Sequence, residues 1–239
     1  MEDKFSSYDV IAHIIPGGFL WIGLSLYPYL ILNQLIKEQG DNARLAIYLM
    51  LFFSIGLIIQ YLSSIVEFII KKKEWGGKMF SEVCLIKPFC NIENNTRDQI
   101  LKEIANRFNY PIESLVETLH VTNTKSQEFN QATRLCKEIY YKINAYTLEK
   151  GSFNKAHSYY EMYGLFRGLC FNCIFLAIVF SFLLFFHNGY EVLINWLYII
   201  TFVILSFTFY DRAIDRGERY VDGLLYSFLV INNQESQAK

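Results

Sequence analysis

Four polar side chains share one face of an otherwise apolar segment. They occupy positions i, i+3, i+4 and i+7, which coincide on one side of an α-helix, and they are Gln60, Ser63, Ser64 and Glu67. Polar groups inside an apolar helix are costly and usually turn toward protein or water. The stripe therefore predicts either the lining of an ion path or hydrogen bonds to a neighbouring helix. Glu67 also lies four residues before Lys71, so a local ion pair is an alternative for that carboxylate.

Three arginines form a second set that could bind a ligand. Arg212, Arg216 and Arg219 follow the last apolar stretch of the chain at helical spacing. A guanidinium group binds phosphate in a planar, bidentate geometry, so the set is a candidate site for an anion such as a nucleotide. The alternative is that these arginines anchor the helix at the membrane surface and pair with the nearby carboxylates Asp215 and Glu218.

A third set of charged residues precedes and follows the C-terminal apolar stretches: His157, Glu161, Arg167 and Asp215. His157 and Glu161 are four residues apart, but two ligands do not complete a zinc site. We expect a network in which Glu161 or Asp215 bonds to an arginine. No His-Glu-x-x-His, Gly-Lys-Ser/Thr or Gly-x-Ser-x-Gly pattern is present, so we predict no catalytic residue, metal or cofactor. A membrane enzyme ranks third among the possible functions.

Four apolar stretches position these residues, and each is long enough to cross a bilayer. They run from Val10 to Ile36, Leu45 to Ile70, Leu165 to Phe186 and Val192 to Tyr210. The chain is 53% hydrophobic and 17% aromatic, which favours a membrane over water around its outer surface. Its formal net charge of -1 gives no general affinity for nucleic acid.

The distribution of Lys and Arg predicts the orientation. Lys71, Lys72 and Lys73 follow the second stretch directly, and the three arginines follow the fourth, whereas residues 187–191 contain no basic residue except His187. We therefore expect a multi-pass protein of the bacterial inner membrane with both termini in the cytoplasm. The predicted parts are a transmembrane hairpin (1–70), a cytoplasmic helical domain (71–161), a second hairpin (162–210) and a cytoplasmic C-terminal helix and tail (211–239).

The predicted fold is all-α, with four transmembrane helices and the helical domain inserted between the second and third. In that domain we expect a helix capped by Thr96, a short helix after Pro111 and an amphipathic helix from Gln127 to Lys150. The third and fourth spans have few helix-breaking residues beyond the membrane, so we expect them to continue into the helical domain. Pro16 indicates either a break in the first helix or a helix that begins just before it, with the proline in the first turn.

The N-terminal residues Tyr8-Asp9 with Pro16-Gly17, together with this layout, resemble the four-span membrane components of bacterial anti-phage defence systems, such as the Kiwa membrane component and CBASS-like or Hailong-type effectors. The resemblance implies a homo-oligomer, with a tetramer favoured, whose cytoplasmic domain receives a nucleotide or oligonucleotide signal or a defence protein. Its spans then form or gate an ion-permeable pore. The alternative function is a non-conducting sensor or scaffold that passes a signal to a partner protein.

Overall fold

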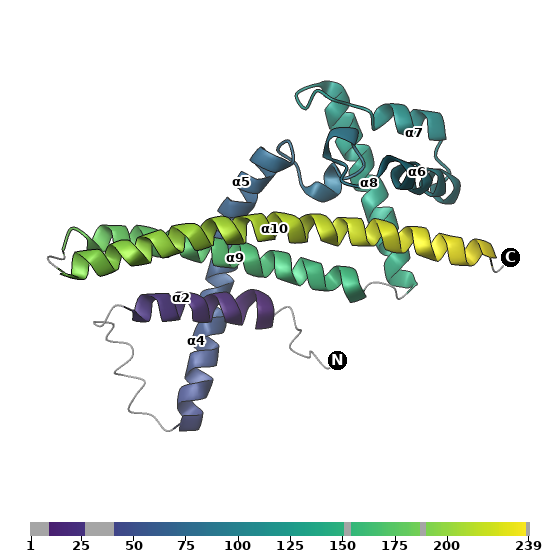
Figure 1. Cartoon of the computed structure of the whole chain (residues 1–239). Coiled ribbons are helices and arrows are strands. Elements are labelled where there is room, and N and C mark those ends of the chain that lie inside the picture. Colours follow the sequence, from purple (N-terminus) through teal and green to yellow (C-terminus); the bar gives the residue numbers. More distant parts are fainter. Residues whose placement is uncertain (1–9, 27–40, 151–153, 187–189, 238–239) are drawn as a thin grey trace. The chain divides into compact units, whose positions relative to one another are not determined.

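The computed structural model describes residues 10–26, 41–150, 154–186 and 190–237. Every regular element in these residues is a helix, which confirms the predicted all-α class (Figure 1). The chain divides into two compact units. The first comprises Met1–Glu67 and Glu161–Asp215, and the second comprises Phe68–Tyr160 and Arg216–Lys239. Three helices contribute residues to both units: α5 (Ser64–Glu74), α9 (Asn154–Leu183) and α10 (Tyr190–Gln237).

Three helices in the described residues are long and apolar enough to cross a membrane, where the sequence predicted four. They lie within Arg44–Glu74, Ser158–Leu183 and Glu191–Glu235. The described part of the first predicted span is a shorter apolar helix, Val10–Ser25, and the rest of that span lies outside the described residues. The prediction of a membrane protein is therefore supported. That the first predicted stretch also crosses the membrane remains a prediction.

The N-terminal helix changes its geometry beside Pro16. Residues Val10–Ile14 form the π-helix η1, and the α-helix α2 (Ile15–Ser25) follows with Pro16 in its first turn. Proline is tolerated there because a first-turn N–H has no partner within the helix. The predicted break is thus a change of helix type, and the proline lies where the simpler interpretation placed it.

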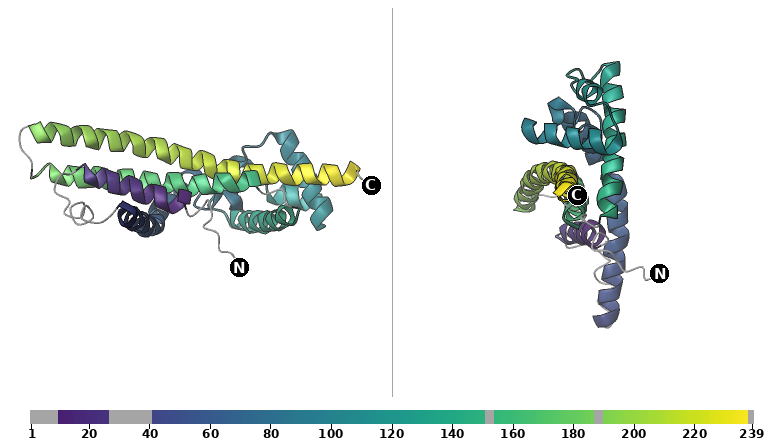
Figure 2. Two further views of the ribbon diagram at one scale, coloured as in Figure 1. Left: turned by 90° about the horizontal axis from the view of Figure 1, so that it is seen from below. Right: turned by 90° about the vertical axis from the view of Figure 1, so that its right-hand side faces the viewer.

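Two glycines allow η1 and α2 to touch the backbone of α4 (Asp41–Leu62). A Cβ atom on Gly17 would lie 1.9 Å from the carbonyl oxygen of Phe52, and one on Gly56 would lie 2.0 Å from that of His13. No side chain fits at either position. In both views of Figure 2, α4 lies across α2 and α9 rather than alongside them. Small residues are typical of such close crossings between apolar helices.

The first unit has its apolar core between α9 and the first half of α10, which lie side by side and antiparallel (Figure 2). The core contains Cys173, Leu176, Phe180, Ile199 and Phe202. Cys170 also points across this contact, because its Sγ lies 3.4 Å from the carbonyl oxygen of Ser206. The Cys-x-x-Cys pair therefore packs between the helices, and all five cysteines are free.

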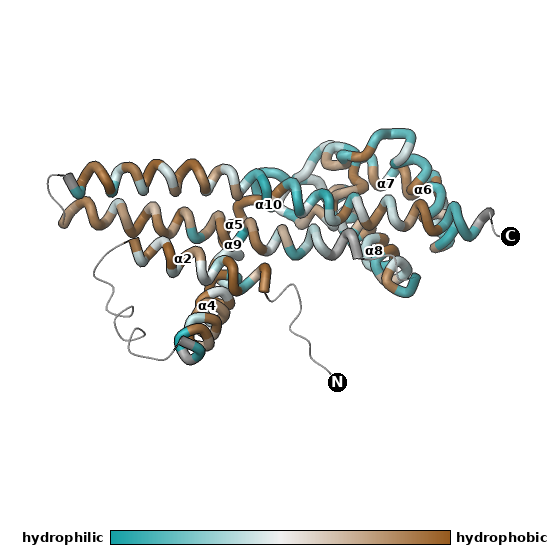
Figure 3. Tube along the Cα trace, turned by 60° about the horizontal axis from the view of Figure 1, so that its bottom comes forward, coloured by the Kyte–Doolittle hydropathy of each residue, from teal (hydrophilic) through white to brown (hydrophobic). Residues whose placement is uncertain are grey.

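The outer surface of the first unit is apolar, as Figure 3 shows by its brown α4 and brown first half of α10. Large exposed apolar side chains follow α4 along its length: Leu45, Leu49, Met50, Leu57, Ile58 and Tyr61. An apolar surface of this extent requires lipid or another protein copy around it.

The second unit is a small helical domain. After α5 (Ser64–Glu74) come the short 3₁₀ helices η2 (Phe80–Glu82) and η3 (Lys87–Phe89), then α6 (Asn94–Phe108), α7 (Ile112–Thr118) and α8 (Gln127–Glu149). The predicted amphipathic helix is α8, capped by the Ser126 side chain, which accepts a hydrogen bond from the Phe129 N–H. The predicted cap at Thr96 is wrong, because α6 begins two residues earlier with Glu93 as its N-cap residue.

The crossing of α4 and η1 gives the first prediction. Gly56→Ala forces a methyl group against the backbone of His13, so the helices must separate. We expect a loss of about 2 kcal/mol in the free energy of unfolding, because the group that is overlapped is backbone and cannot rotate away. Thermal unfolding of the detergent-solubilised chain measures the loss. Ser54→Ala, at an exposed position of the same helix, is the matched control, and equal stability of the two variants would contradict the crossing.

Candidate functional site

The candidate site lies where α4 meets α5, in one of the three apolar helices. The α-helical pattern is interrupted for the single residue Ser63 between Leu62 and Ser64. The Ser63 N–H still donates to the carbonyl of Ile59 at 2.7 Å, so the two helices continue in nearly the same direction. Ser63 is fully buried, Gln60 and Glu67 are half-buried, and Ser64 is exposed. Three of the four residues in the predicted stripe therefore face the protein.

Arg167 of α9 binds all three of these side chains. Its Nε donates to Ser63 Oγ at 3.1 Å, and its Nη2 donates to Gln60 Oε1 at 2.9 Å. Its Nη1 forms an ion pair with Glu67 Oε2. We call these four residues the Arg167 cluster. Each of the three guanidinium nitrogens thus has a partner on the α4–α5 side of the contact, and the Arg167 and Glu67 side chains are only 15% and 17% exposed.

Gln60 connects the cluster to two more backbone segments. Its Nε2 donates to the carbonyl of Ala12 at 2.6 Å and to that of Gly164 at 3.0 Å. Four residues after Ala12 stands Pro16, which has no N–H with which to bond that carbonyl. The amide of Gln60 therefore donates to a carbonyl that Pro16 cannot bond, and to the Gly164 carbonyl of α9 as well. One side chain holds η1, α4 and α9 together.

The same contact continues along α9 at Asn172, which is fully buried. Its Nδ2 donates to the carbonyl of Pro16 at 2.8 Å. Between these two amides, Gly168 leaves room for the proline ring and the glutamine, because a Cβ there would lie 3.3 Å from Pro16 Cγ and 3.4 Å from Gln60 Nε2. Polar side chains of α4 and α9 thus bind the distorted N-terminal helix on both sides of Pro16.

The electrostatics of the Arg167 cluster make it an all-or-none contact. A guanidinium and a carboxylate attract strongly where water is excluded, but either charge alone in such a place is costly. The Tyr163 ring, 5.5 Å from the Arg167 Cζ atom, adds a cation–π contact from the same helix. The intact cluster can hold the helices together, and its loss can release them.

The other residues singled out from the sequence lie on α9 and α10. Arg212 belongs to the first unit and is exposed, while Arg216 and Arg219 belong to the second. The Arg216 guanidinium lies 5.5 Å from the centre of the Tyr159 ring, and Arg219 is exposed. Glu161 is 6% exposed, and Asp215 is half-buried. His157 falls within α9, but its side chain lies outside the described residues.

Further polar contacts stabilise the second unit. Glu218 of α10 accepts hydrogen bonds from Trp75 Nε1 at 3.1 Å and from Asn91 Nδ2 at 2.8 Å, so it ties α10 to the turn after α5 and to the segment before α6. The buried Arg97 donates twice to the carbonyl of Leu85. Cys84 and Cys136 lie with their sulfur atoms 3.8 Å apart, and their mutual hydrogen bond, together with burial, raises the pKa of the Cys84 thiol well above its usual value. These contacts are structural.

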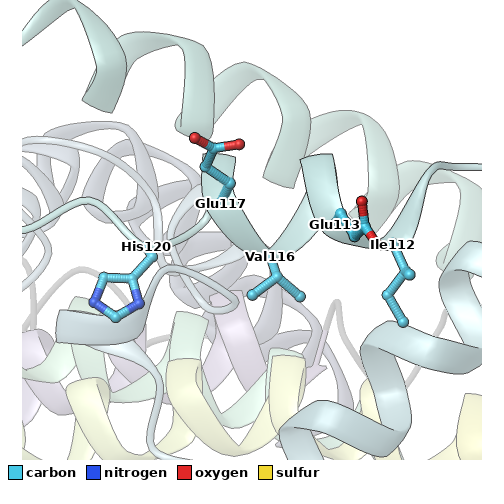
Figure 4. Close-up of a pocket in the computed structure, with 5 residues that line it drawn as sticks. All are labelled: Ile112, Glu113, Val116, Glu117 and His120. Atoms are coloured by element: carbon cyan, nitrogen blue, oxygen red, sulfur yellow. The ribbon is translucent and has the colours of Figure 1, made fainter.

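A shallow groove lies on α7 of the second unit (Figure 4). Its volume is about 590 Å³, and its walls are the apolar Ile112 and Val116 with the polar Glu113, Glu117 and His120. Four of the five belong to the short helix α7, and His120 follows it in the sequence. Within the described residues, no group of three or more His, Cys, Asp or Glu side chains could hold a metal ion.

The pairing of Arg167 with Glu67 is the contact that sequence reasoning missed. From local spacing, Glu67 was expected to pair with Lys71, and Glu161 or Asp215 was expected to bond to an arginine. The sequence does contain a signal: Arg167 is the one Lys or Arg inside an apolar stretch away from its ends, and Glu67 is an acidic residue inside another. A buried charge needs an opposite charge at the same depth, so these two residues were candidates for each other.

The Arg167 cluster gives the second prediction. Arg167→Gln and Glu67→Gln each leave one charge without its partner, and we expect each to lower the free energy of unfolding by about 3 kcal/mol. The double variant removes both charges, so its loss in the free energy of unfolding should be smaller than the sum of the two single losses. Unfolding in detergent micelles, followed by tryptophan fluorescence, measures the cycle. Ser64→Ala, the exposed neighbour, should change stability by less than about 0.5 kcal/mol. Strictly additive losses would show that the two residues do not interact.

Comparison of the chain with known protein families, curated proteins and solved structures gives no match.

Proposed function

We propose that this chain is an oligomeric inner-membrane effector of bacterial anti-phage defence, in which a cytoplasmic helical domain receives a signal and the spans gate an ion-permeable pore. The observation that carries the proposal is the Arg167–Glu67 pair between two apolar helices. Charged residues at such positions are costly, and they typically mark ion paths, relays or switches. The anti-phage assignment comes from the resemblance of the N-terminal residues and the layout.

The Arg167 cluster supports a gate because it has two clearly different states. In the closed state Arg167 occupies the polar face of α4 and α5, and Gln60, Ser63 and Glu67 bond to it. When Arg167 withdraws, these three side chains require water or ions in its place. A signal drives this change only if it binds the open arrangement more tightly than the closed one.

The continuity of α9 and α10 supports a route for that signal. Each is one uninterrupted helix with residues in both compact units, and Arg167 lies on α9 seven residues after the unit boundary at Tyr160 and Glu161. A shift or rotation of α9 that starts in the second unit therefore moves Arg167 without any intervening loop. This is the proposed coupling between the signal and the gate.

The exposed apolar face of α4 supports assembly of several copies. One helix with one polar face cannot enclose a water-filled path, so conduction requires that face to be repeated around an axis. A tetramer is the arrangement that the resemblance favours. Lipid and neighbouring copies would cover the large apolar side chains of α4, such as Leu57 and Ile58.

The direction of α4 bears on which helices cross the bilayer. Spanning helices tilt from the membrane normal by about 20° on average and rarely beyond about 40°. Because α4 lies across α9 rather than alongside it, both can span one bilayer only if α4 swings about its contact with α9. The Arg167 cluster and the Gly56 crossing are the pivot for such a swing. Topology mapping tests this requirement directly.

The proposed topology gives the third prediction. A cysteine in place of Lys102, exposed in the second unit, should react with a membrane-impermeant maleimide only after the inner membrane is opened. A cysteine in place of Met50, exposed on α4, should not react in either case, because lipid covers it when α4 spans. The wild-type chain is the blank. Labelling of Lys102→Cys in intact cells would show that the orientation is opposite to the proposed one. Labelling of Met50→Cys would show that α4 lies at the membrane surface.

The proposed gate gives the fourth prediction, which needs no knowledge of the stimulus. In liposomes, Arg167→Gln removes the contact that holds the closed state, so we expect ion flux without a signal. If the contact is worth about 3 kcal/mol, the open population rises about 100-fold. Replacing Gln60 and Glu67 with leucine in the same chain should abolish that flux. Ser54→Ala is the control, and a size-exclusion profile like that of the wild type shows that each variant is assembled.

A non-conducting sensor or scaffold is the second candidate, and one observation favours it. Arg167 donates to Gln60, and Gln60 donates to the carbonyls of Ala12 and Gly164. A network bonded in this way also suits a rigid bundle that stays closed. In that case neither Arg167→Gln nor the leucine variants conduct. If the assembled Arg167→Gln variant shows no ion flux, the pore hypothesis is rejected in favour of the scaffold. The scaffold would pass its signal to a cytoplasmic partner protein.

A further inference from the structure

The second unit contains a polar pocket that the sequence did not reveal. It has a volume of about 440 Å³ and is lined by Lys78, Gln127, Asn130, Gln131, Thr133 and Arg134. The volume falls in the range of about 300–1,000 Å³ that is usual for small-molecule sites. Every lining side chain is polar, and two of them are cationic. The pocket is therefore suited to a small anion with further hydrogen-bonding groups.

Two consecutive glycines bring Lys78 to this pocket. Gly76 and Gly77 have φ values of 60° and 85°, a conformation that other residues rarely adopt, and they end α5 and turn the chain toward α8. A Cβ on Gly76 would lie 3.0 Å from the Phe89 ring and 3.4 Å from the Phe129 ring, so the turn packs closely on the domain. Lys78 is thereby fixed beside a helix that begins about fifty residues later in the sequence.

The remaining wall comes from the polar face of α8. Gln127, Asn130, Gln131 and Arg134 lie at i, i+3, i+4 and i+7, and all four are exposed. The opposite face of α8 is anchored by the fully buried Phe129, Ala132 and Cys136, so the polar face cannot turn inward. Buried Thr133 closes the base, and its hydroxyl donates to the Asn130 carbonyl at 3.0 Å. The Asn130 Nδ2 donates to the Ser126 carbonyl at 3.5 Å, and side-chain amides can both donate and accept hydrogen bonds.

The charge of the pocket is positive. Lys78 and Arg134 line it, and no carboxylate is among its lining residues. The nearby Glu82 is paired with Lys137, whose Nζ lies 2.6 Å from its Oε1, so that carboxylate is already neutralised. A lysine and an arginine on two different elements give a point charge and a planar fork, which together suit the oxygens of a phosphate.

We propose that this pocket binds the phosphate group of a small ligand, with Lys78 and Arg134 on the phosphate oxygens and the three amides on the rest of the molecule. The inference rests on the proposed function in one respect, since it names the pocket as the place where the cytoplasmic domain receives its signal. The lining residues of this pocket differ from the anion-site candidates Arg212, Arg216 and Arg219. Two sources share the phosphate chemistry: a free nucleotide and the headgroup of an anionic lipid.

The test measures binding to the full-length chain without any flux assay, so failure of the pore leaves it unaffected. Calorimetry with inorganic phosphate and with adenosine monophosphate probes the free ligand. Thermal stability in nanodiscs of phosphatidylcholine, with or without phosphatidylglycerol, probes the headgroup. The variants are Lys78→Gln and Arg134→Gln, with Lys87→Gln, an exposed lysine outside the pocket, as the charge-matched control.

We expect the wild type and Lys87→Gln to bind one class of probe alike, and each pocket variant to bind it about tenfold more weakly, as loss of a charged hydrogen bond predicts. Unchanged unfolding temperatures of the pocket variants without ligand show that the fold is intact. Binding of the soluble probes assigns a nucleotide-type ligand, and stabilisation by phosphatidylglycerol alone assigns a lipid headgroup. The proposal is wrong if neither probe binds, or if Lys87→Gln weakens binding as much as the pocket variants do.

Discussion

The first unit depends on one requirement: the charge of Arg167 must be neutralised among apolar side chains. Glu67 supplies the opposite charge, and Ser63 and Gln60 accept the remaining guanidinium hydrogen bonds. Since a lone charge at this position would cost several kcal/mol, the pairing fixes how α4 and α5 align with α9. Apolar side chains alone would not do so, because apolar contacts are not directional and lipid offers equivalent ones. The polar cluster therefore determines the arrangement that the apolar surfaces merely allow.

A second constraint follows from the shape of the contact. Because α4 lies across its neighbours, the backbones approach closely only near the crossing, and the sequence places Gly56 and Gln60 there. Gly56 allows the backbones to touch, and Gln60 then reaches the Ala12 carbonyl. Close approach and hydrogen bonding thus depend on each other. A side chain at Gly56 would separate the helices and also remove the bonds of Gln60.

Sequence patterns predicted the elements far better than their contacts. The apolar runs, the amphipathic α8 and the short α7 after Pro111 followed from periodicity, because each element's pattern lies within its own residues. The start of α6 was misplaced because several polar residues between Glu93 and Asp98 can begin a helix. The pairing of Arg167 with Glu67 joins residues one hundred positions apart, and Lys71 was the nearer candidate by spacing. The pocket at Lys78 needed the positive φ values of two glycines, which only the folded backbone reveals.

The bonding within the Arg167 cluster also determines how a signal would have to open the proposed gate. Its bonds are mutually dependent: Gln60 accepts from Arg167 while donating to Ala12 and Gly164, so a partial displacement of Arg167 weakens several contacts together. Such a cluster does not relax gradually, so the gate that we propose would have few intermediates between its closed and open states. A ligand at a distance can release it only by moving a rigid element, and α9 is the one that carries both Gly164 and Arg167.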